Sequence, residues 1–128
     1  MGKCSKAISL ASEYMNSSKG IQELLKEFSC TIQFYLEGEE PFALKLQDGK
    51  AKFLEYEIKD ADVEIYADSD TFFDIIIGKI NPDQAYLDGT VEIKGSIMYA
   101  VILKHVGEVM RKEHPKLFAT VKAFSRFI

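Results

Sequence analysis

The sequence contains few of the residues that carry metal or nucleophilic chemistry. Its 128 residues include two cysteines, Cys4 and Cys30, and two histidines, His105 and His114. Two isolated cysteines are too few for a disulfide framework or a thiolate metal cluster, and the histidines lack the spacing of a ligand pair. We interpret His105 as a residue at the border of the core. With neither a G-x-S-x-G motif nor a glycine-rich phosphate loop, the chain is predicted to be no enzyme and to hold no metal or cofactor.

A basic excess and a long apolar run are also missing. The formal net charge is −4, which argues against a nucleic-acid partner because nucleic acids select basic surfaces. No stretch reaches the roughly 18 apolar residues that span a bilayer. Ser9, Ser12 and Glu13 interrupt the first apolar segment, so no signal peptide is expected. Residues 125–128 do not form a peroxisomal address, and a cytoplasmic location is therefore the expectation.

What the sequence has in quantity is large apolar side chains. Apolar residues make up 47% of the chain and charged residues 28%, which is ordinary for a globular protein, and this length fits one domain. Nine phenylalanines and six tyrosines are present. Charge is uneven, because residues 104–128 carry six basic and two acidic side chains against the acidic excess of the rest.

The spacing of apolar residues predicts an α+β fold. Spacings of three and four over residues 7–15 and 21–28 indicate two amphipathic helices or one kinked helix. Alternation then indicates strands at 32–36, at 42–46, from Lys50 onward and at 63–67. Asp48-Gly49 is a strong hairpin signal. We expect these strands to form a meander with one apolar face, and the shift of apolar phase after Phe53 indicates a bulge or a twisted crossing.

The second half is predicted to contain four helices and one more strand. Acceptor side chains at Asp68 and Asn81 can begin helices at 71–77 and 82–88. A fifth strand is expected at 90–94, followed by a helix from residue 96 that ends before Pro115, and by a terminal helix. The terminal helix has an apolar side and a basic side. The apolar side comprises Leu117, Phe118, Val121, Phe124 and Ile128, and the basic side comprises Lys116, Lys122 and Arg126.

Two of these helices, at 71–77 and 96–103, are apolar nearly all round. A helix of this kind is either surrounded by ordinary core or has one side along a cavity. The residue pattern alone supports both readings.

A series of short motifs runs through residues 48–103. The motifs are Asp48-Gly49-Lys50, Ala61-Asp62-Val63-x-Ile65, Ala67-Asp68-Ser69-Asp70-x-Phe72, Gly78-Lys79-Ile80-Asn81-Pro82-x-x-Ala85-Tyr86-x-x-Gly89 and Val91-x-Ile93-Lys94-Gly95, with Ala100 and Leu103 beyond. In order and spacing they resemble the sterol carrier protein-2 family, also called the non-specific lipid-transfer or SCP2-like domain. The alternation at 29–47 also fits the first hairpin of that family.

The resemblance implies a five-stranded, mostly antiparallel sheet with helices packed on one face and an apolar tunnel between the layers. It implies a single domain over 1–128, with its core at about 18–106 and an extra C-terminal helical segment at 107–128. The implied function is binding and transfer of a lipid, sterol or fatty-acyl chain without covalent chemistry. Expected ligand contacts are Phe34, Leu44 and Leu46 from the sheet and Phe72, Phe73, Ile76, Ile77, Tyr86, Leu87, Ile97, Met98, Val101 and Ile102 from the helices.

Two other functions stay open at this point. In the first, Met98 and Ile102 fill the cavity, and the protein is an interaction or accessory module that acts through its C-terminal helix. In the second, which we rank last, an enzyme acts on acyl substrates and needs a carboxylate or His105 facing the cavity. The basic terminal helix is expected to cap the tunnel, to form a homodimer contact or to rest on an anionic membrane.

Overall fold

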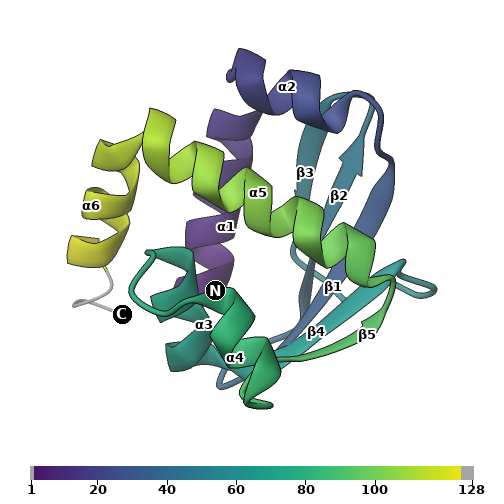
Figure 1. Ribbon diagram of the computed structural model, residues 1–128, viewed down its shortest axis with the longest axis vertical. Helices are drawn as coiled ribbons and strands as arrows, with labels where there is room; N and C mark the ends of the chain where they lie inside the picture. The colour runs from purple at the N-terminus through teal and green to yellow at the C-terminus, as the bar shows by residue number, and fades with distance from the viewer. Residues whose placement is uncertain (1, 125–128) are drawn as a thin grey trace.

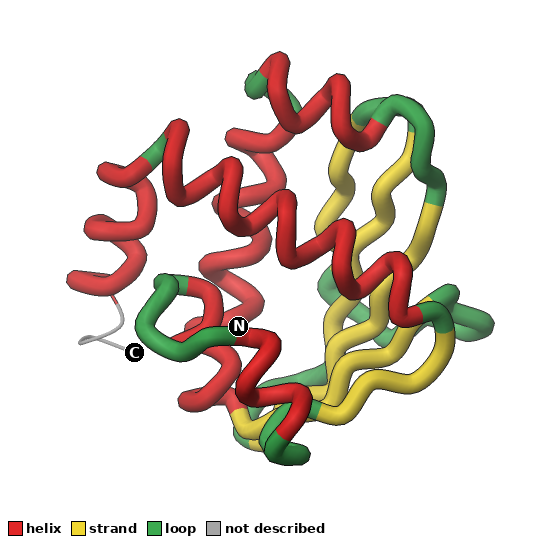
Figure 2. The backbone as a smooth tube through the Cα atoms, viewed as in Figure 1, coloured by secondary structure: helices red, strands yellow, loops and turns green. Residues whose placement is uncertain are grey.

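The computed structural model describes residues 2–124. They form one five-stranded sheet and six helices, and the helices all lie on the same side of the sheet (Figure 1; Figure 2). The helices are α1 (Lys3–Met15), α2 (Lys19–Leu25), α3 (Ser69–Ile76), α4 (Pro82–Leu87), α5 (Ile97–Glu113) and α6 (Pro115–Phe124). The strands are β1 (Cys30–Glu37), β2 (Phe42–Gln47), β3 (Lys50–Leu54), β4 (Val63–Asp68) and β5 (Glu92–Gly95).

The sheet has the order β3-β2-β1-β4-β5. Its pairs are antiparallel except that β4 runs parallel to β1, so the predicted α+β class with a mostly antiparallel sheet is confirmed. The predicted meander of the first four strands is wrong, since β4 pairs with β1 and not with β3. The alternation of apolar residues predicts which face of a strand is buried but not which strand lies next to it. In the structure β4 pairs with the free edge of β1, whereas a meander would place β4 beside β3.

The crossover at residues 55–62 is anchored on the face of the sheet away from the helices. The fully buried side chain of Gln33 accepts a hydrogen bond from the Ile58 N–H at 2.8 Å and donates one to the Phe42 carbonyl at 2.9 Å. At the end of the crossover, the Asp62 carboxylate accepts from the Thr31 N–H at 2.7 Å. The two bonds of Gln33 satisfy polar groups that burial would otherwise leave costly, and the bond between Asp62 and Thr31 helps to fix where β4 begins.

The apolar phase shift after Phe53 marks the end of a strand. Phe53 lies opposite Leu44 on the helix-covered face, whereas Leu54 lies opposite Ala43 on the other face. Pairing of β2 with β3 continues without interruption to Leu54, where β3 ends. The predicted bulge is therefore absent from this pair, and the next apolar residues belong to the crossover.

The helix starts follow the capping residues that the sequence predicts. The Asp68 carboxylate accepts from the Thr71 N–H at 3.2 Å, and the Asn81 side chain accepts from the Asp83 N–H at 2.8 Å with Pro82 in the first turn. Such caps satisfy backbone donors that have no partner within the helix. At the other end of the chain, α5 ends at Glu113, as the position of Pro115 predicts.

Helix α1 is capped by a residue from a distant turn. Gly2 offers no side chain, and Glu39 from the β1–β2 turn accepts hydrogen bonds from the N–H groups of Cys4 at 2.9 Å and Ser5 at 3.0 Å. The Ser69 hydroxyl donates to the same carboxylate at 2.5 Å. Burial raises the pKa of Glu39, but the hydrogen bonds from Ser69, Ser5 and Cys4 outweigh it, and the net pKa lies below the usual value. Glu39 thus joins the starts of α1 and α3.

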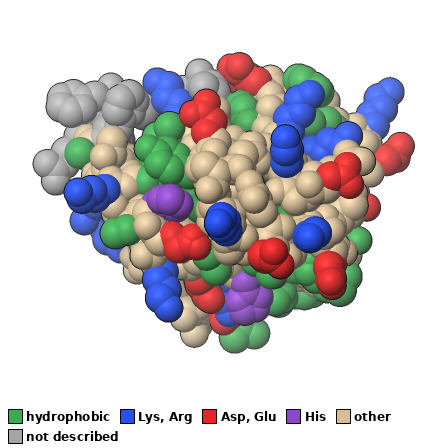
Figure 3. All heavy atoms as spheres, turned by 90° about the horizontal axis from the view of Figure 1, so that it is seen from above, with side chains coloured by type: hydrophobic (Ala, Val, Ile, Leu, Met, Phe, Trp, Pro, Cys, Tyr) green, Lys and Arg blue, Asp and Glu red, His purple; other side chains and the backbone are tan. Residues whose placement is uncertain are grey.

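The surface carries charges of both signs. In the view from the α2 end, basic and acidic side chains are interspersed with hydrophobic ones, and neither sign covers the face (Figure 3). Within residues 2–124, no helix has the length and apolar character needed to cross a membrane.

Candidate functional site

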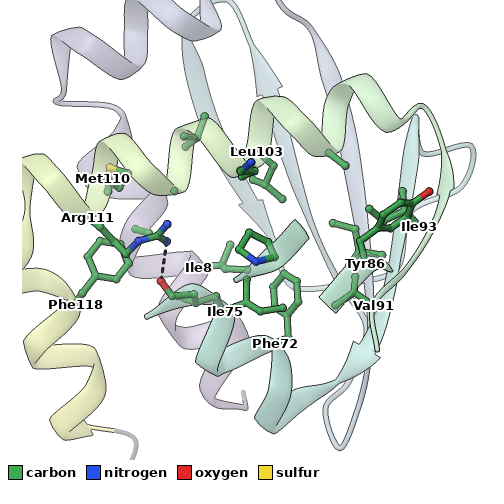
Figure 4. Close-up of a pocket in the computed structure, with 18 of the residues that line it drawn as sticks. Ile8, Phe72, Ile75, Tyr86, Val91, Ile93, Leu103, Met110, Arg111 and Phe118 are labelled. Carbon is green, nitrogen blue, oxygen red and sulfur yellow. Dashed lines mark hydrogen bonds between the residues drawn. The ribbon is translucent and has the colours of Figure 1, made fainter. Parts of the chain in front are cut away.

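An apolar cavity lies between the helix layer and the β4–β5 side of the sheet (Figure 4). Its volume is about 150 Å³. Every layer of the fold contributes to its wall, which is lined by Ile8, Ala11, Met15, Ile65, Phe72, Ile75, Ile76, Pro82, Tyr86, Val91, Ile93, Ala100, Leu103, Lys104, Val106, Gly107, Met110, Arg111 and Phe118.

Helical spacing brings the longest part of the wall together. On α5, the lining residues Ala100, Leu103, Gly107 and Met110 recur at intervals of three and four and therefore share one side of the helix. On α1, Ile8 and its neighbours at positions 11 and 15 do the same. Between Ala100 and Arg111 the wall extends about 16 Å, at about 1.5 Å per helical residue, so the cavity has an elongated wall.

The cavity reaches the surface between α4 and α5. Tyr86 lines it and is also 41% exposed. At the same place the Lys104 ammonium forms an ion pair with the Asp83 carboxylate at 2.7 Å, which links the two helices. We call this opening, bounded by Pro82, Tyr86 and Lys104, the mouth.

Charged side chains are rare along the wall. Lys104 at the mouth is paired with Asp83. Arg111 lies beyond it near Met110 and Phe118, and its guanidinium donates a hydrogen bond to the Ile76 carbonyl at 3.2 Å (Figure 4). The remainder of the wall is apolar apart from the Tyr86 side chain.

His105 does not face the cavity. It is exposed on α5 and lies 3.5 Å from the Glu108 carboxylate, so its interpretation as a border-of-core residue is wrong. The interpretation failed because it considered the apolar neighbours of His105 in the sequence and not its angular position on the helix. His105 lies on the exposed side of α5, whereas Val106 lies on the buried side.

Three of the predicted ligand contacts line the cavity, namely Phe72, Ile76 and Tyr86. Others lie in the packed core and outside the cavity wall. Phe34, for example, stacks on Phe42 with ring centroids 4.8 Å apart and meets the edge of Phe72. The core members of the set are Phe34, Leu44, Leu46, Phe73 and Ile102, which are buried, and Ile77, which is half-buried.

The other four predicted contacts are exposed. On α5, Ile97, Met98 and Val101 are 47%, 56% and 44% exposed, and Leu87 on α4 is 76% exposed. None of the four lines the cavity in this structure. Ligand contact by any of the thirteen predicted residues stays a prediction.

The sequence prediction did not include most of the wall. The lining residues of α1 belong to a recognised apolar stripe, but no ligand contact was predicted for them. On α5, the stripe Ala100, Leu103, Gly107 and Met110 mixes small and large residues, and choosing by hydrophobicity alone favoured its neighbours Met98 and Val101. The spacing of three and four residues along the helix was the signal that could have identified this stripe. Arg111 had no sequence signal at all, because a charged residue near a helix C-terminus is ordinary.

The described part of the apolar side of α6 faces the molecule. Leu117 and Val121 are buried, and Phe118 lines the cavity. Of the residues predicted for this helix, Arg126 and Ile128 lie outside the described residues, and so does the side chain of Phe124.

Comparison with known proteins assigns the fold and the family. The family model described as the SCP-2 sterol transfer family matches residues 11–107. The chain belongs to this family. The predicted resemblance to sterol carrier protein-2 is thereby confirmed, and membership of the SCP-2 family supports lipid binding or transfer as the general function. No match was found among curated proteins.

Solved structures of SCP-2 proteins and of a larger enzyme share the fold. The sterol carrier protein domain 2 of Helicoverpa armigera aligns with a TM-score of 0.70 at 21% identity, covering 84% of this chain and 87% of that one. A UbiJ-SCP2 ubiquinone synthesis protein aligns with a TM-score of 0.66 at 14% identity, covering 79% and 84%.

Another similar structure is the inverting sec-alkylsulfatase Pisa1 from a Pseudomonas species. It aligns with a TM-score of 0.57 at 20% identity over 68% of this chain. This chain spans only 14% of the length of that enzyme. The likeness therefore concerns a small part of a larger protein and concerns the fold alone.

Proposed function

We propose that this SCP-2 protein binds an elongated apolar ligand, such as a fatty-acyl chain or a sterol, in the cavity and transfers it without covalent chemistry. The observation that carries the proposal is the elongated apolar wall that runs from the mouth at Tyr86 to Arg111. Family membership supports the same conclusion. Of the two basic side chains on this wall, Lys104 forms an ion pair with Asp83 and Arg111 donates a hydrogen bond to a backbone carbonyl.

The energetics of such binding are adequate. A chain of about sixteen carbons gains on the order of 12 kcal/mol before costs, at about 0.8 kcal/mol per buried methylene. Ordering of the ligand and loss of its free motion reduce this to roughly micromolar affinity or better. Because apolar walls discriminate a single methylene by only about 1–3 kcal/mol, broad ligand specificity is expected.

The ligand needs more room than the present cavity offers. Its volume of about 150 Å³ is below the roughly 300–1,000 Å³ of typical ligand sites and near that of an engineered cavity that holds benzene. Two boundaries supply the additional space in our proposal. One is the mouth, where the exposed Lys104–Asp83 pair holds the six-residue α4 against α5. The other is Phe118, through which α6 serves as a lid.

A pair of adjacent substitutions on α5 tests the proposal. Ala100 lines the cavity, whereas Val101 is 44% exposed and does not. Ala100→Trp fills the space beside the mouth and is expected to weaken binding of a fluorescent fatty acid by at least about tenfold, which is about 1.4 kcal/mol. Val101→Trp adds the same ring outside and should leave binding unchanged. Native mass spectrometry of protein purified without detergent provides an independent measurement of a bound lipid.

The wild-type protein decides whether the proposal survives. Delipidated protein that gives no saturable signal with the fluorescent fatty acid at tens of micromolar contradicts it. Equal loss of binding in both tryptophan variants would also contradict it, because the bound probe would then lie elsewhere.

One observation favours a second candidate, a module that binds a partner. The cavity is small, and Ile97, Met98 and Val101 present apolar side chains to solvent on α5. This surface replaces the C-terminal helix as the candidate contact, because Leu117 and Val121 of α6 are buried. A homodimer is the simplest form of such a contact. Sedimentation of the wild type and of Met98→Glu would detect it as an association that the glutamate abolishes.

A further inference from the structure

The two basic side chains of the cavity wall differ in their partners. At the mouth, the Lys104 ammonium is 2.7 Å from the Asp83 carboxylate. Arg111 lies toward the opposite end from Tyr86, and no carboxylate of residues 2–124 pairs with it. Within the same part of the chain, its one hydrogen bond goes to the Ile76 carbonyl at 3.2 Å (Figure 4). The wall therefore contains one basic group whose charge is already paired and one whose charge is not.

Close packing holds the guanidinium of Arg111 in place. A Cβ atom added to Gly78 would be 3.1 Å from its Cδ and 3.2 Å from its Nε, and one added to Gly107 would be 3.3 Å from its Nη1. Gly78 also adopts a φ of +82°, which other residues rarely adopt. A side chain confined in this way loses little further conformational freedom when it binds a ligand group. The entropy cost of binding is therefore smaller than for a mobile side chain.

An unpaired positive charge on an apolar wall favours the binding of an anion. Half-buried charges are stabilised by a partner of opposite sign, and a guanidinium offers a planar set of donors that fits a carboxylate with two parallel hydrogen bonds. A single Arg111 balances one negative charge. A phosphate monoester would bring a second charge, and the other basic side chain of the described cavity wall, Lys104, is already paired with Asp83.

We propose that Arg111 binds the carboxylate of a long-chain fatty acid whose tail extends along the cavity toward Tyr86. This inference rests on the proposed function and narrows its ligand to a monoanionic, single-chain lipid. Arg111 has a structural role as well, since its bond to the Ile76 carbonyl satisfies an acceptor in the last turn of α3. The test must separate the two roles.

The experiment compares palmitate with hexadecanol, which has the same chain length and no charge. Both displace a fluorescent fatty acid from the delipidated full-length chain. The wild type is expected to prefer palmitate by at least about tenfold, the effect of a charge-assisted hydrogen bond. Arg111→Met keeps a long side chain and should lose this preference while retaining its affinity for hexadecanol. Arg111→Lys should keep part of it.

Lys112→Met is the matched control. Lys112 follows Arg111 on α5, is exposed, and contributes the same formal charge. Its loss changes the net charge equally and should leave the preference for palmitate intact. Urea unfolding of each variant, measured without ligand, reports how much stability the bond from Arg111 to Ile76 contributes.

The outcomes distinguish this inference from the proposed function. If neither lipid binds the wild type, both fail. If the two lipids bind the wild type equally, the carrier function stands and the role of Arg111 is overturned. An equal loss of palmitate and hexadecanol binding in Arg111→Met also overturns it and leaves Arg111 a purely structural residue. Loss of the preference in Lys104→Gln in place of Arg111→Met would put the carboxylate at the mouth and overturn the inference as well.

Discussion

The two halves of the space between sheet and helices are packed differently. On the β1–β3 side, Ile32 and Phe34 are fully buried, and Ile21 from α2 is fully buried as well. On the β4–β5 side, Ile65 and Ile93 point toward the same helix layer but line the cavity. Side chains of similar size and hydrophobicity thus form a filled core in one half and a cavity wall in the other.

The difference lies in the helices that cover each half. Residues of α1 pack against β3, and the small, buried side chain of Ala7 allows that helix to lie close to its neighbours. The β4–β5 half is covered by the short helices α3 and α4 and by one side of α5, where Ala100 and Gly107 leave space. The same composition therefore produces a filled core or a cavity according to helix length and to the placement of small residues.

The largest expected effect comes from two isoleucines on neighbouring strands. Ile32 in β1 and Ile65 in β4 are 0% and 4% exposed, and only Ile65 faces the cavity. Ile32→Ala should lower the free energy of unfolding by about 3–4 kcal/mol, because it leaves a new void in a filled core. Ile65→Ala should cost less, about 2 kcal/mol, since the side facing the cavity has fewer contacts to lose. Urea unfolding measures both.

Ligand binding gives the same pair a second readout. Ile65→Ala enlarges the cavity and should keep or increase affinity for a fatty acid, whereas Ile32→Ala should leave the ligand site as it is. If the two substitutions destabilise the protein equally and do not differ in binding, the two halves are packed alike. That result would contradict the distinction between a filled half and a cavity half.

A second prediction concerns α1, which lies at the boundary of the halves. Glu39 holds its first turn against Ser69, and α1 contributes Ile8 to the cavity wall. Glu39→Gln should lower the free energy of unfolding at pH 7 by about 1–2 kcal/mol, as expected for loss of a charged cap. Glu40→Gln removes the adjacent, exposed carboxylate and should have little effect.

The lowered pKa of Glu39 also predicts the direction in which its contribution to stability changes with pH. The folded pKa of Glu39 is lowered relative to its ordinary value, so the unfolded chain binds the proton more readily. The stabilisation is fully present above the ordinary glutamate pKa of about 4.3 and is lost as pH falls through the lower folded value. The difference in unfolding free energy between wild type and Glu39→Gln should therefore shrink below about pH 5. A difference that is constant down to pH 3 would contradict this role.

Much of the fold could be predicted from the sequence, and particular residues show where prediction stopped. Asp68 and Asn81 predicted helix starts because capping is local chemistry, and the motifs around Pro82 predicted the family. The partner of β4 could not be predicted, since the contacts of Gln33 that anchor the crossover join residues 25 apart along the chain.

The candidate site was predicted less well than the fold. Phe72, Ile76 and Tyr86 were identified and line the cavity, whereas Leu87 on the same short helix as Tyr86 is exposed. Met98 was included, and Arg111 was omitted, because hydrophobicity was weighed without the phase of the helix. The position of a cavity depends on how the helices pack against one another. Whether a residue lines it therefore depends more on its position on the helix than on its residue type.

The smallest expected effect concerns the mouth, which separates the cavity half from solvent. Lys104→Gln removes the ion pair with Asp83 that holds α4 against α5. Exposed ion pairs contribute little to stability, so the urea midpoint and the affinity for a fatty acid should stay nearly unchanged. The rates of uptake and release should both rise, because α4 no longer has to break this contact before a ligand passes. Stopped-flow fluorescence measures the two rates. If both rates stay at the wild-type value, ligands pass elsewhere, and the lid at Phe118 becomes the route to test.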